Sequence, residues 1–127
     1  QPTESIEERI TKVVNKSTQL TNNGVLKQEW KSKEVILYVW DSYHEDHDKV
    51  DVFVNGKLVC PDLEIQSKKY KIAFDPLDGK NTVRIVAKNE GTMSPNTVHA
   101  MLVDGAVTTP FVTKLKEGEA VYIELTH

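Results

Sequence analysis

The chain has 127 residues, of which 39% are hydrophobic and 28% are charged, and its formal net charge is −3. This length fits one domain with a sizeable core. The acidic balance argues against a nucleic-acid binder, which shows a basic stripe, and against a polybasic membrane anchor. The single cysteine excludes a disulfide scaffold and a cysteine-rich zinc module. No apolar run approaches the roughly 18 residues of a membrane-spanning helix, so the sequence predicts no transmembrane segment.

The N-terminal segment, residues 1–16, allows two interpretations. Ser5 and Glu8 are spaced as in a helix capping box. Apolar residues follow at helical spacing, namely Ile6, Ile10, Val13 and Val14. This periodicity favours a helix from Ser5 to Asn15. The same residues also suit a short turn followed by an extended edge strand over Arg9–Lys16.

From Glu34 onward the dominant period is two, which is typical of strands. The stretch Glu34–Trp40 is apolar at nearly every position, so it is predicted to be a strand that is buried on both faces or covered on its outer face. The other predicted strands are Val50–Asn55, Lys57–Cys60, Tyr70–Phe74, Thr82–Ala87, Val98–Val103, Ala106–Thr108, Phe111–Leu115 and Ala120–Leu125.

Turn signals separate these strands. Asn55-Gly56 predicts a type I′ hairpin, and Pro61-Asp62 is predicted to end the strand that precedes it. Further turns are predicted at Asp75–Gly79, Ser94–Asn96, Asp104-Gly105 and Glu117-Gly118. Short strands with turn signals at this spacing indicate an all-β fold. We predict a single antiparallel β-sandwich over residues 1–127, immunoglobulin-like or jelly-roll-like, with about seven to nine strands.

The conspicuous cluster is Asp41–Asp51, which contains four Asp, one Glu and two His in eleven positions. Calcium takes hard oxygen ligands from flexible loops, and the predicted set is Asp41, Asp46, Asp48 and Asn89. Asn89 joins this set if the sandwich brings the Asn89–Thr97 loop beside the acidic one. An acidic surface turn, in which Asp side chains accept bonds from nearby backbone N–H groups, explains the same residues without a metal.

Two histidines lie inside the acidic cluster. His44 and His47 are three residues apart, and with Asp46 or Asp48 they suit zinc. His99 is the distant candidate for a further ligand, and two solvated imidazoles are the simpler alternative. The residues predicted to contact a ligand or partner at this end are Tyr43, His44, His47 and Asn96.

Aromatic residues and the cysteine have simpler interpretations. Trp30 is predicted to be at least partly exposed, whereas Trp40 and Tyr38 are predicted to fill the core. Cys60 is predicted to be a buried residue rather than a nucleophile, because no catalytic motif surrounds it. No serine has the context of a nucleophile elbow, so the sequence predicts a protein that is not an enzyme. The alternative is a hydrolase, which would need a histidine with a perturbed pKa in a cleft.

A series of motifs runs in order from Val35 to Gly105: Asp41 with Asp46-His47-Asp48, Val50-x-Val52, Asn55-Gly56-Lys57, Gly79-Lys80-Asn81 through Ala87, Asn89, Gly91, Pro95-Asn96-Thr97 and Asp104-Gly105. This series resembles a small β-sandwich domain of exported Bacteroidetes proteins. Two positions depart from the family pattern. The glycine between two aspartates is His47 here, and the Asn-Gly after the first aspartate is Ser42-Tyr43.

The resemblance implies a β-sandwich, export to the periplasm or cell surface, and an extended N-terminal segment. Gln1 suits a residue that follows signal-peptide cleavage, or a boundary chosen for other reasons. We expect a non-catalytic binding module that acts through the loops at one end of the sandwich. One candidate partner is a glycan or cell-envelope component, supported by calcium. The other is a protein steered by the acidic loop, as for an inhibitor, an immunity protein or an envelope-assembly subunit.

Overall fold

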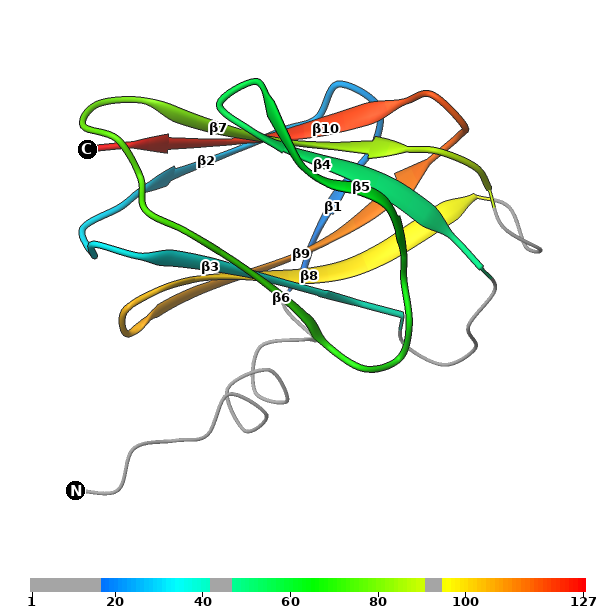
Figure 1. Cartoon of the computed structure of the whole chain (residues 1–127), viewed down its shortest axis with the longest axis horizontal. Coiled ribbons are helices and arrows are strands. Elements are labelled where there is room, and N and C mark those ends of the chain that lie inside the picture. The colour runs from blue at the N-terminus through cyan, green and yellow to red at the C-terminus, as the bar shows by residue number, and fades with distance from the viewer. Residues whose placement is uncertain (1–16, 42–46, 91–94) are drawn as a thin grey trace.

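In the computed structural model, which describes residues 17–41, 47–90 and 95–127, two five-stranded sheets pack face to face (Figure 1). The first sheet has the order β1-β9-β8-β3-β6 and the second has the order β2-β10-β7-β4-β5. The strands are β1 (Thr18–Leu20), β2 (Val25–Glu29), β3 (Val35–Trp40), β4 (Lys49–Val54), β5 (Lys57–Glu64), β6 (Tyr70–Phe74), β7 (Asn81–Ala87), β8 (Asn96–Asp104), β9 (Val107–Leu115) and β10 (Ala120–Thr126). In these described ranges no helix has the length and apolar character needed to span a membrane.

The all-β sandwich prediction is confirmed, but the strand count and part of the pairing are wrong. The described residues contain ten strands rather than seven to nine. β1 and β2 are additional strands, and the two strands predicted on either side of Pro110 form the single strand β9. β1 and β2 pair in parallel with β9 and β10, whereas the other pairs are antiparallel. The helical and extended alternatives for residues 1–16 lie outside the described residues.

The core forms because alternate residues of each central strand face the opposite sheet. In β3, Val35, Leu37 and Val39 are at most 1% exposed, and in β7 Val83 and Ile85 are fully buried. Burying an aliphatic side chain of this size contributes about 1.5–3 kcal/mol. The period of two therefore explains both the strands and the layer between the sheets.

A second, smaller cluster lies on the outer face of the first sheet. It contains Trp40, Met101 and Val103, against which Ile36 and Tyr38 pack. These residues alternate with the inward-facing ones of β3 and β8. On the outer face of β3, Trp40 is buried and Ile36 and Tyr38 are half-buried, so the prediction that this face is covered holds only in part. Trp40 is buried, as expected, but on this outer face rather than between the sheets, and Tyr38 is only half-buried.

The prediction that Trp30 is partly exposed is wrong, because the side chain is only 7% exposed and belongs to the main core. Its ring stacks on His127, with ring centroids 4.5 Å apart. The indole Nε1 donates a hydrogen bond of 3.3 Å to the carbonyl of Gly79. Contacts with a distant turn and with the C-terminal residue bury this ring, and local sequence does not encode them.

The sequence predicts that the strand Lys57–Cys60 ends before Pro61-Asp62. In the structure this strand, β5, continues to Glu64. The pairing of β5 with β4 shifts register between Val50 and Val52 and again between Val52 and Phe53. Asp62 adopts a positive φ of 47° and donates its N–H to Asp51 Oδ1 at 2.8 Å. Proline is tolerated because β5 is an edge strand with bulges.

The hairpin at Asn55-Gly56 has the type of turn that the sequence predicts. Asn55 and Gly56 have φ values of 51° and 81°, as a type I′ turn requires.

Asp104, the last residue of β8, anchors the β2–β3 connection. Its carboxylate accepts hydrogen bonds of 2.8 Å from the backbone N–H groups of Lys31 and Ser32.

Candidate functional site

The β3–β4 and β7–β8 connections lie at the same end of the sandwich (Figure 1). β3 pairs antiparallel with β8 and β4 pairs antiparallel with β7, so both connections cross between the sheets at that end. They comprise residues 41–48 and 88–95. The sequence predicts binding through these two loops, and the structure brings their described bases together. We call these two connections the loop end.

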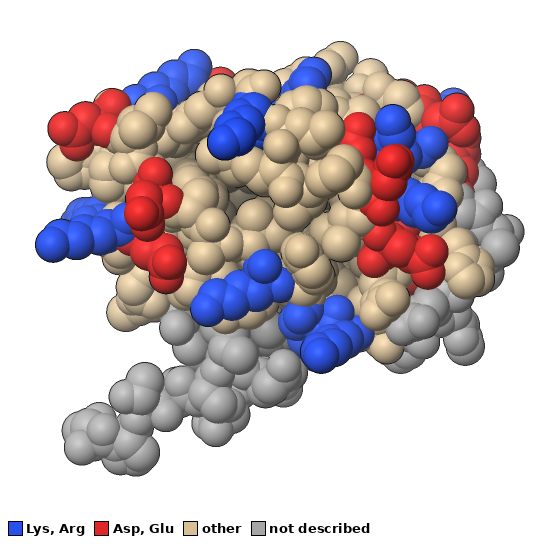
Figure 2. All heavy atoms as spheres, in the orientation of Figure 1, with Lys and Arg blue, Asp and Glu red and all other residues tan. Residues whose placement is uncertain are grey.

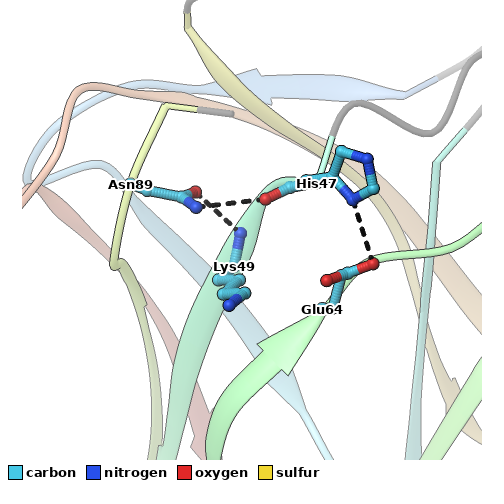
Figure 3. Close-up of polar contacts among 4 residues, drawn as sticks. All are labelled: His47, Lys49, Glu64 and Asn89. Carbon is cyan, nitrogen blue, oxygen red and sulfur yellow. Dashed lines mark hydrogen bonds and ion pairs between the residues drawn. The ribbon is translucent and has the colours of Figure 1, made fainter. Parts of the chain in front are cut away.

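Asn89 ties the two connections with its side-chain amide (Figure 3). Its Oδ1 accepts a hydrogen bond of 2.9 Å from the N–H of Lys49, and its Nδ2 donates one of 3.1 Å to the carbonyl of His47. Next to it, the N–H of Lys88 donates to the carbonyl of Lys49 at 2.8 Å. The Asn89 amide therefore extends the β4–β7 pairing beyond the end of β7.

Asn96 adds a second tie from the start of β8. This side chain is fully buried, and its Nδ2 donates hydrogen bonds of 3.0 Å to the carbonyl of Lys49 and 2.8 Å to the carbonyl of Asn89. The sequence predicts Asn89 as a calcium ligand and Asn96 as a partner contact. In the structure both amides bind the main chain of the loop bases.

Two acidic residues flank the acidic loop from sheltered positions. Asp48 is 1% exposed, and its Oδ2 accepts a hydrogen bond of 3.0 Å from the N–H of Thr97. The carbonyl of Asp48 accepts one of 2.8 Å from the N–H of Ile65. Asp41 is also buried, and its N–H donates to the carbonyl of Gln66 at 2.8 Å. Both aspartates therefore belong to the base of the loop rather than to its solvated surface.

His47 is exposed to solvent, whereas the neighbouring Asp48 is buried. Its side chain is 67% exposed and its Nδ1 lies 3.3 Å from Glu64 Oε2 (Figure 3). Its backbone has a positive φ of 63°, a conformation that glycine adopts without steric cost. The motif comparison implies glycine at this position in the resembling domains.

Of the predicted site residues, the metal ligand Asp46, the zinc candidate His44 and the partner contact Tyr43 lie outside the described residues. Among the residues that the structure describes, no group of three or more His, Cys, Asp and Glu side chains is arranged to hold a metal.

His99, the distant zinc candidate, lies beside Trp40 of the outer-face cluster. Its ring stacks on Trp40, with centroids 6.2 Å apart. Burial lowers the pKa of His99, the nearby charge of Asp41 opposes this shift, and Lys114 adds to it. A histidine kept neutral by its surroundings suits packing against an indole ring.

Cys60 lies half-buried in β5. Burial raises the pKa of its thiol, and a hydrogen bond with Tyr70 partly offsets that shift. Because the thiolate is the nucleophilic form, a raised pKa weakens this cysteine as a nucleophile.

A groove of about 500 Å³ that the sequence does not predict lies between the edge strands β5 and β6. Its lining residues are Pro61, Asp62, Leu63, Glu64, Gln66, Lys68, Lys69, Tyr70 and Lys71. The lysine-rich run that precedes and enters β6 is the sequence signal that points to it. Figure 2 shows this side of the molecule, with β5 and β6 in front and the groove between them.

Comparison with protein-family models, with curated proteins and with solved structures gives no match. The resemblance to exported Bacteroidetes domains therefore stays a prediction from the motifs. The structure itself defines a β-sandwich with two connections tied together at one end and a groove along one open side.

Proposed function

We propose that this chain is a non-catalytic binding module that engages a protein partner through the loop end. The observation that carries the proposal is the set of hydrogen bonds by which Asn89 and Asn96 join both loop bases at Lys49. Loops held at rigid bases lose less conformational entropy on binding. A buried amide network at the base of two adjacent loops supports such a role.

An immunoglobulin-like arrangement supports the same proposal. The order β10-β7-β4-β5 matches the G-F-C-C′ order of an immunoglobulin sheet, and β3 beside β6 matches the B–E pair. The β8–β9 hairpin is then an addition between the F and G strands that joins the other sheet. In this alignment the connection 41–48 takes the place of the B–C loop and 88–95 follows strand F. Antibody variable domains bind antigen through the B–C and F–G loops at this end.

The charge around the loop end favours a basic partner. Figure 2 shows Asp and Glu side chains at this end of the molecule, with Lys and Arg side chains among them, and further acidic side chains at the opposite end. Glu64 is partly exposed there beside His47, Glu90 lies on the second connection, and the sequence adds Glu45 and Asp46. The stretch from Asp41 to Asp51 carries five acidic residues against one lysine, and such an excess of one charge steers association and fixes orientation.

Site-specific photocrosslinking tests the proposal. A photoreactive residue replaces Glu45 or Thr92 at the loop end, or Leu77 on the exposed β6–β7 turn at the opposite end. The modified chains are then exposed to an envelope extract. We expect the loop-end positions, and not position 77, to give one defined crosslinked protein. Added salt should weaken its capture.

A matched pair of charge variants completes this test. In chains that carry the photoreactive residue at position 92, Glu45→Lys/Asp46→Lys changes the charge of the loop end, and Asp75→Lys/Asp78→Lys makes the same change of charge at the opposite end. Only the first pair should abolish the crosslink. Equal products from both ends, or no product from the loop end, would contradict the proposal.

Calcium binding by the acidic loop is a second candidate function, and the burial of Asp41 and Asp48 favours it. A cation bound between residues 41 and 48 would offset the cost of sheltering two carboxylates. Such a loop could then support a glycan or cell-envelope ligand. At calcium concentrations tenfold above the dissociation constant we expect a stabilisation of about 1.4 kcal/mol. Thermal unfolding with millimolar calcium should show it, and Asp46→Asn should remove it. An unchanged melting temperature would eliminate this candidate.

We further propose that the protein acts in the periplasm or at the cell surface. The motif resemblance to exported domains supports this, and the lone cysteine is compatible with it. Fractionation of the source cells with an antibody against the domain checks the location. A purely cytoplasmic signal would contradict it.

A further inference from the structure

We infer that the open side of the sandwich is a second binding surface, where an acidic extended peptide segment of a partner protein adds to β6 along the edge that no described strand pairs with. This inference is independent of the loop-end proposal. It uses the groove between β5 and β6, the edge pairing of β6 and the lysines beside that strand.

The β6 edge is suited to strand addition. Within the described part of the chain β6 pairs only with β3, over five consecutive residues from Tyr70 to Phe74 and without a register shift. An edge strand presents a row of outward-pointing N–H and C=O groups that can pair with another chain. The facing edge β5 is less suited, because it contains Pro61 and two register shifts.

The groove beside β6 can accommodate the side chains of an added strand. By its pairing with Val39, Tyr70 is on the same side of β6 as the buried Ile72, which faces the core. Tyr70 lines the groove, and 48% of its surface is exposed. Tyr70 and Leu63 therefore offer apolar contacts for every second residue of an added strand.

The charges of the lysines beside β6 favour an acidic partner. Lys68, Lys69 and Lys71 all lie on the β6 side of the groove, whereas Asp62 and Glu64 come from β5. Figure 2 shows Lys and Arg side chains along the lower side of this face, which is the β6 side. Lysines on an edge strand repel a second copy of the same edge, and the same charges attract an acidic segment. The partner is therefore an acidic strand and not another copy of this chain.

Peptide titration followed by NMR provides the test. The probe is an extended peptide of about seven residues in which Glu alternates with Val, long enough to cover the roughly 17 Å of β6. Two comparison peptides carry Lys in place of Glu, or alternate N-methylated amides that block strand pairing. We expect the acidic peptide to shift the amide signals of Tyr70–Phe74 at up to millimolar concentration. Neither comparison peptide should do so.

Two charge variants locate the interaction. Lys68→Glu/Lys71→Glu should weaken binding of the acidic peptide about tenfold. The control Lys33→Glu/Lys57→Glu makes the same change of charge at exposed positions outside the groove and should leave binding unchanged. Thermal unfolding confirms that both variants fold.

Several outcomes would overturn the inference. They are an absence of shifts at β6 with millimolar acidic peptide, equal binding of the Lys peptide, and equal binding of the N-methylated peptide. Sedimentation of the unliganded chain gives a further check. A dimer that Tyr70→Glu breaks would mean that a second copy occupies the edge instead.

Discussion

The side chain of Asn96 donates a hydrogen bond of 2.8 Å to the main-chain carbonyl of Asn89. The first residue of β8 is thereby tied to the connection that leads into it. Because Asn96 also donates to the carbonyl of Lys49 at 3.0 Å, one buried amide holds both the β3–β4 and the β7–β8 connections in place.

Replacing this amide should destabilise the fold. In Asn96→Ala the buried carbonyls of Asn89 and Lys49 each lose a donor, so the free energy of unfolding should fall by about 2–3 kcal/mol. Urea denaturation measures the loss. The exposed control Lys57→Ala should change stability by less than about 0.5 kcal/mol. An Asn96→Ala protein as stable as that control would mean that the loop bases do not depend on this amide.

His99 should make stability dependent on pH. Burial lowers its folded pKa below the ordinary value of 6.5, with Asp41 opposing and Lys114 adding to the shift. The associated stability is fully present above pH 6.5. It is lost as the pH falls through the folded pKa, because in that window the unfolded chain binds more protons. Unfolding measured at about pH 7.5 and about pH 5 should show the loss. His99→Gln should reduce it, and the exposed His47→Gln should not. Identical pH profiles for His99→Gln and the parent would refute this assignment.

Asp104 gives a second pH dependence at lower pH. Burial by itself would raise its pKa, but hydrogen bonds from Ser32 and Lys31 and the charge of Lys31 outweigh it and lower the pKa below 3.8. The contribution is therefore present above pH 3.8 and is lost as the pH falls through the folded pKa. Asp104→Asn should cost about 2 kcal/mol at neutral pH, since a charged acceptor of two N–H groups is removed. The deficit relative to the parent should shrink in acid. The exposed Asp78→Asn serves as the control, and a deficit that is constant with pH would contradict the prediction.

Much of this architecture could be predicted from the sequence because the central strands carry their own signals. β3 and β7 alternate between core and outer positions, and Asn55-Gly56 specifies its turn. β1 and β2 carry no comparable pattern. They are short and mostly exposed, so they lack the apolar alternation of a buried strand. They lie at sheet edges, where they pair in parallel with β9 and β10, strands that are distant in the sequence.

The sequence predicts where the candidate site lies, but it does not predict what the side chains of the site bind. The loops containing Asp48, Asn89 and Asn96 do meet at one end. Their composition, however, does not distinguish side chains that bind a ligand from side chains that bind the chain itself. The answer depends on which main-chain groups the fold leaves for side chains to bind, such as the N–H of Lys49, which donates to Asn89 Oδ1. The groove between β5 and β6 depends on how the edge strands of two different sheets lie relative to each other, which local sequence does not encode.

The left-handed backbone at His47 yields a test that compares two substitutions at one position. With a φ of 63°, a residue that has a Cβ is strained there by about 1 kcal/mol or more relative to glycine. The ion pair with Glu64 is exposed and contributes little. His47→Gly should therefore be more stable than His47→Ala by about 1 kcal/mol. At Lys33, which does not have a positive φ, the order should reverse, because glycine loses more backbone entropy on folding than alanine. An alanine variant at least as stable as the glycine variant at position 47 would show that the loop base adjusts its backbone. It would also remove the physical reason for a glycine between the two aspartates in the resembling domains.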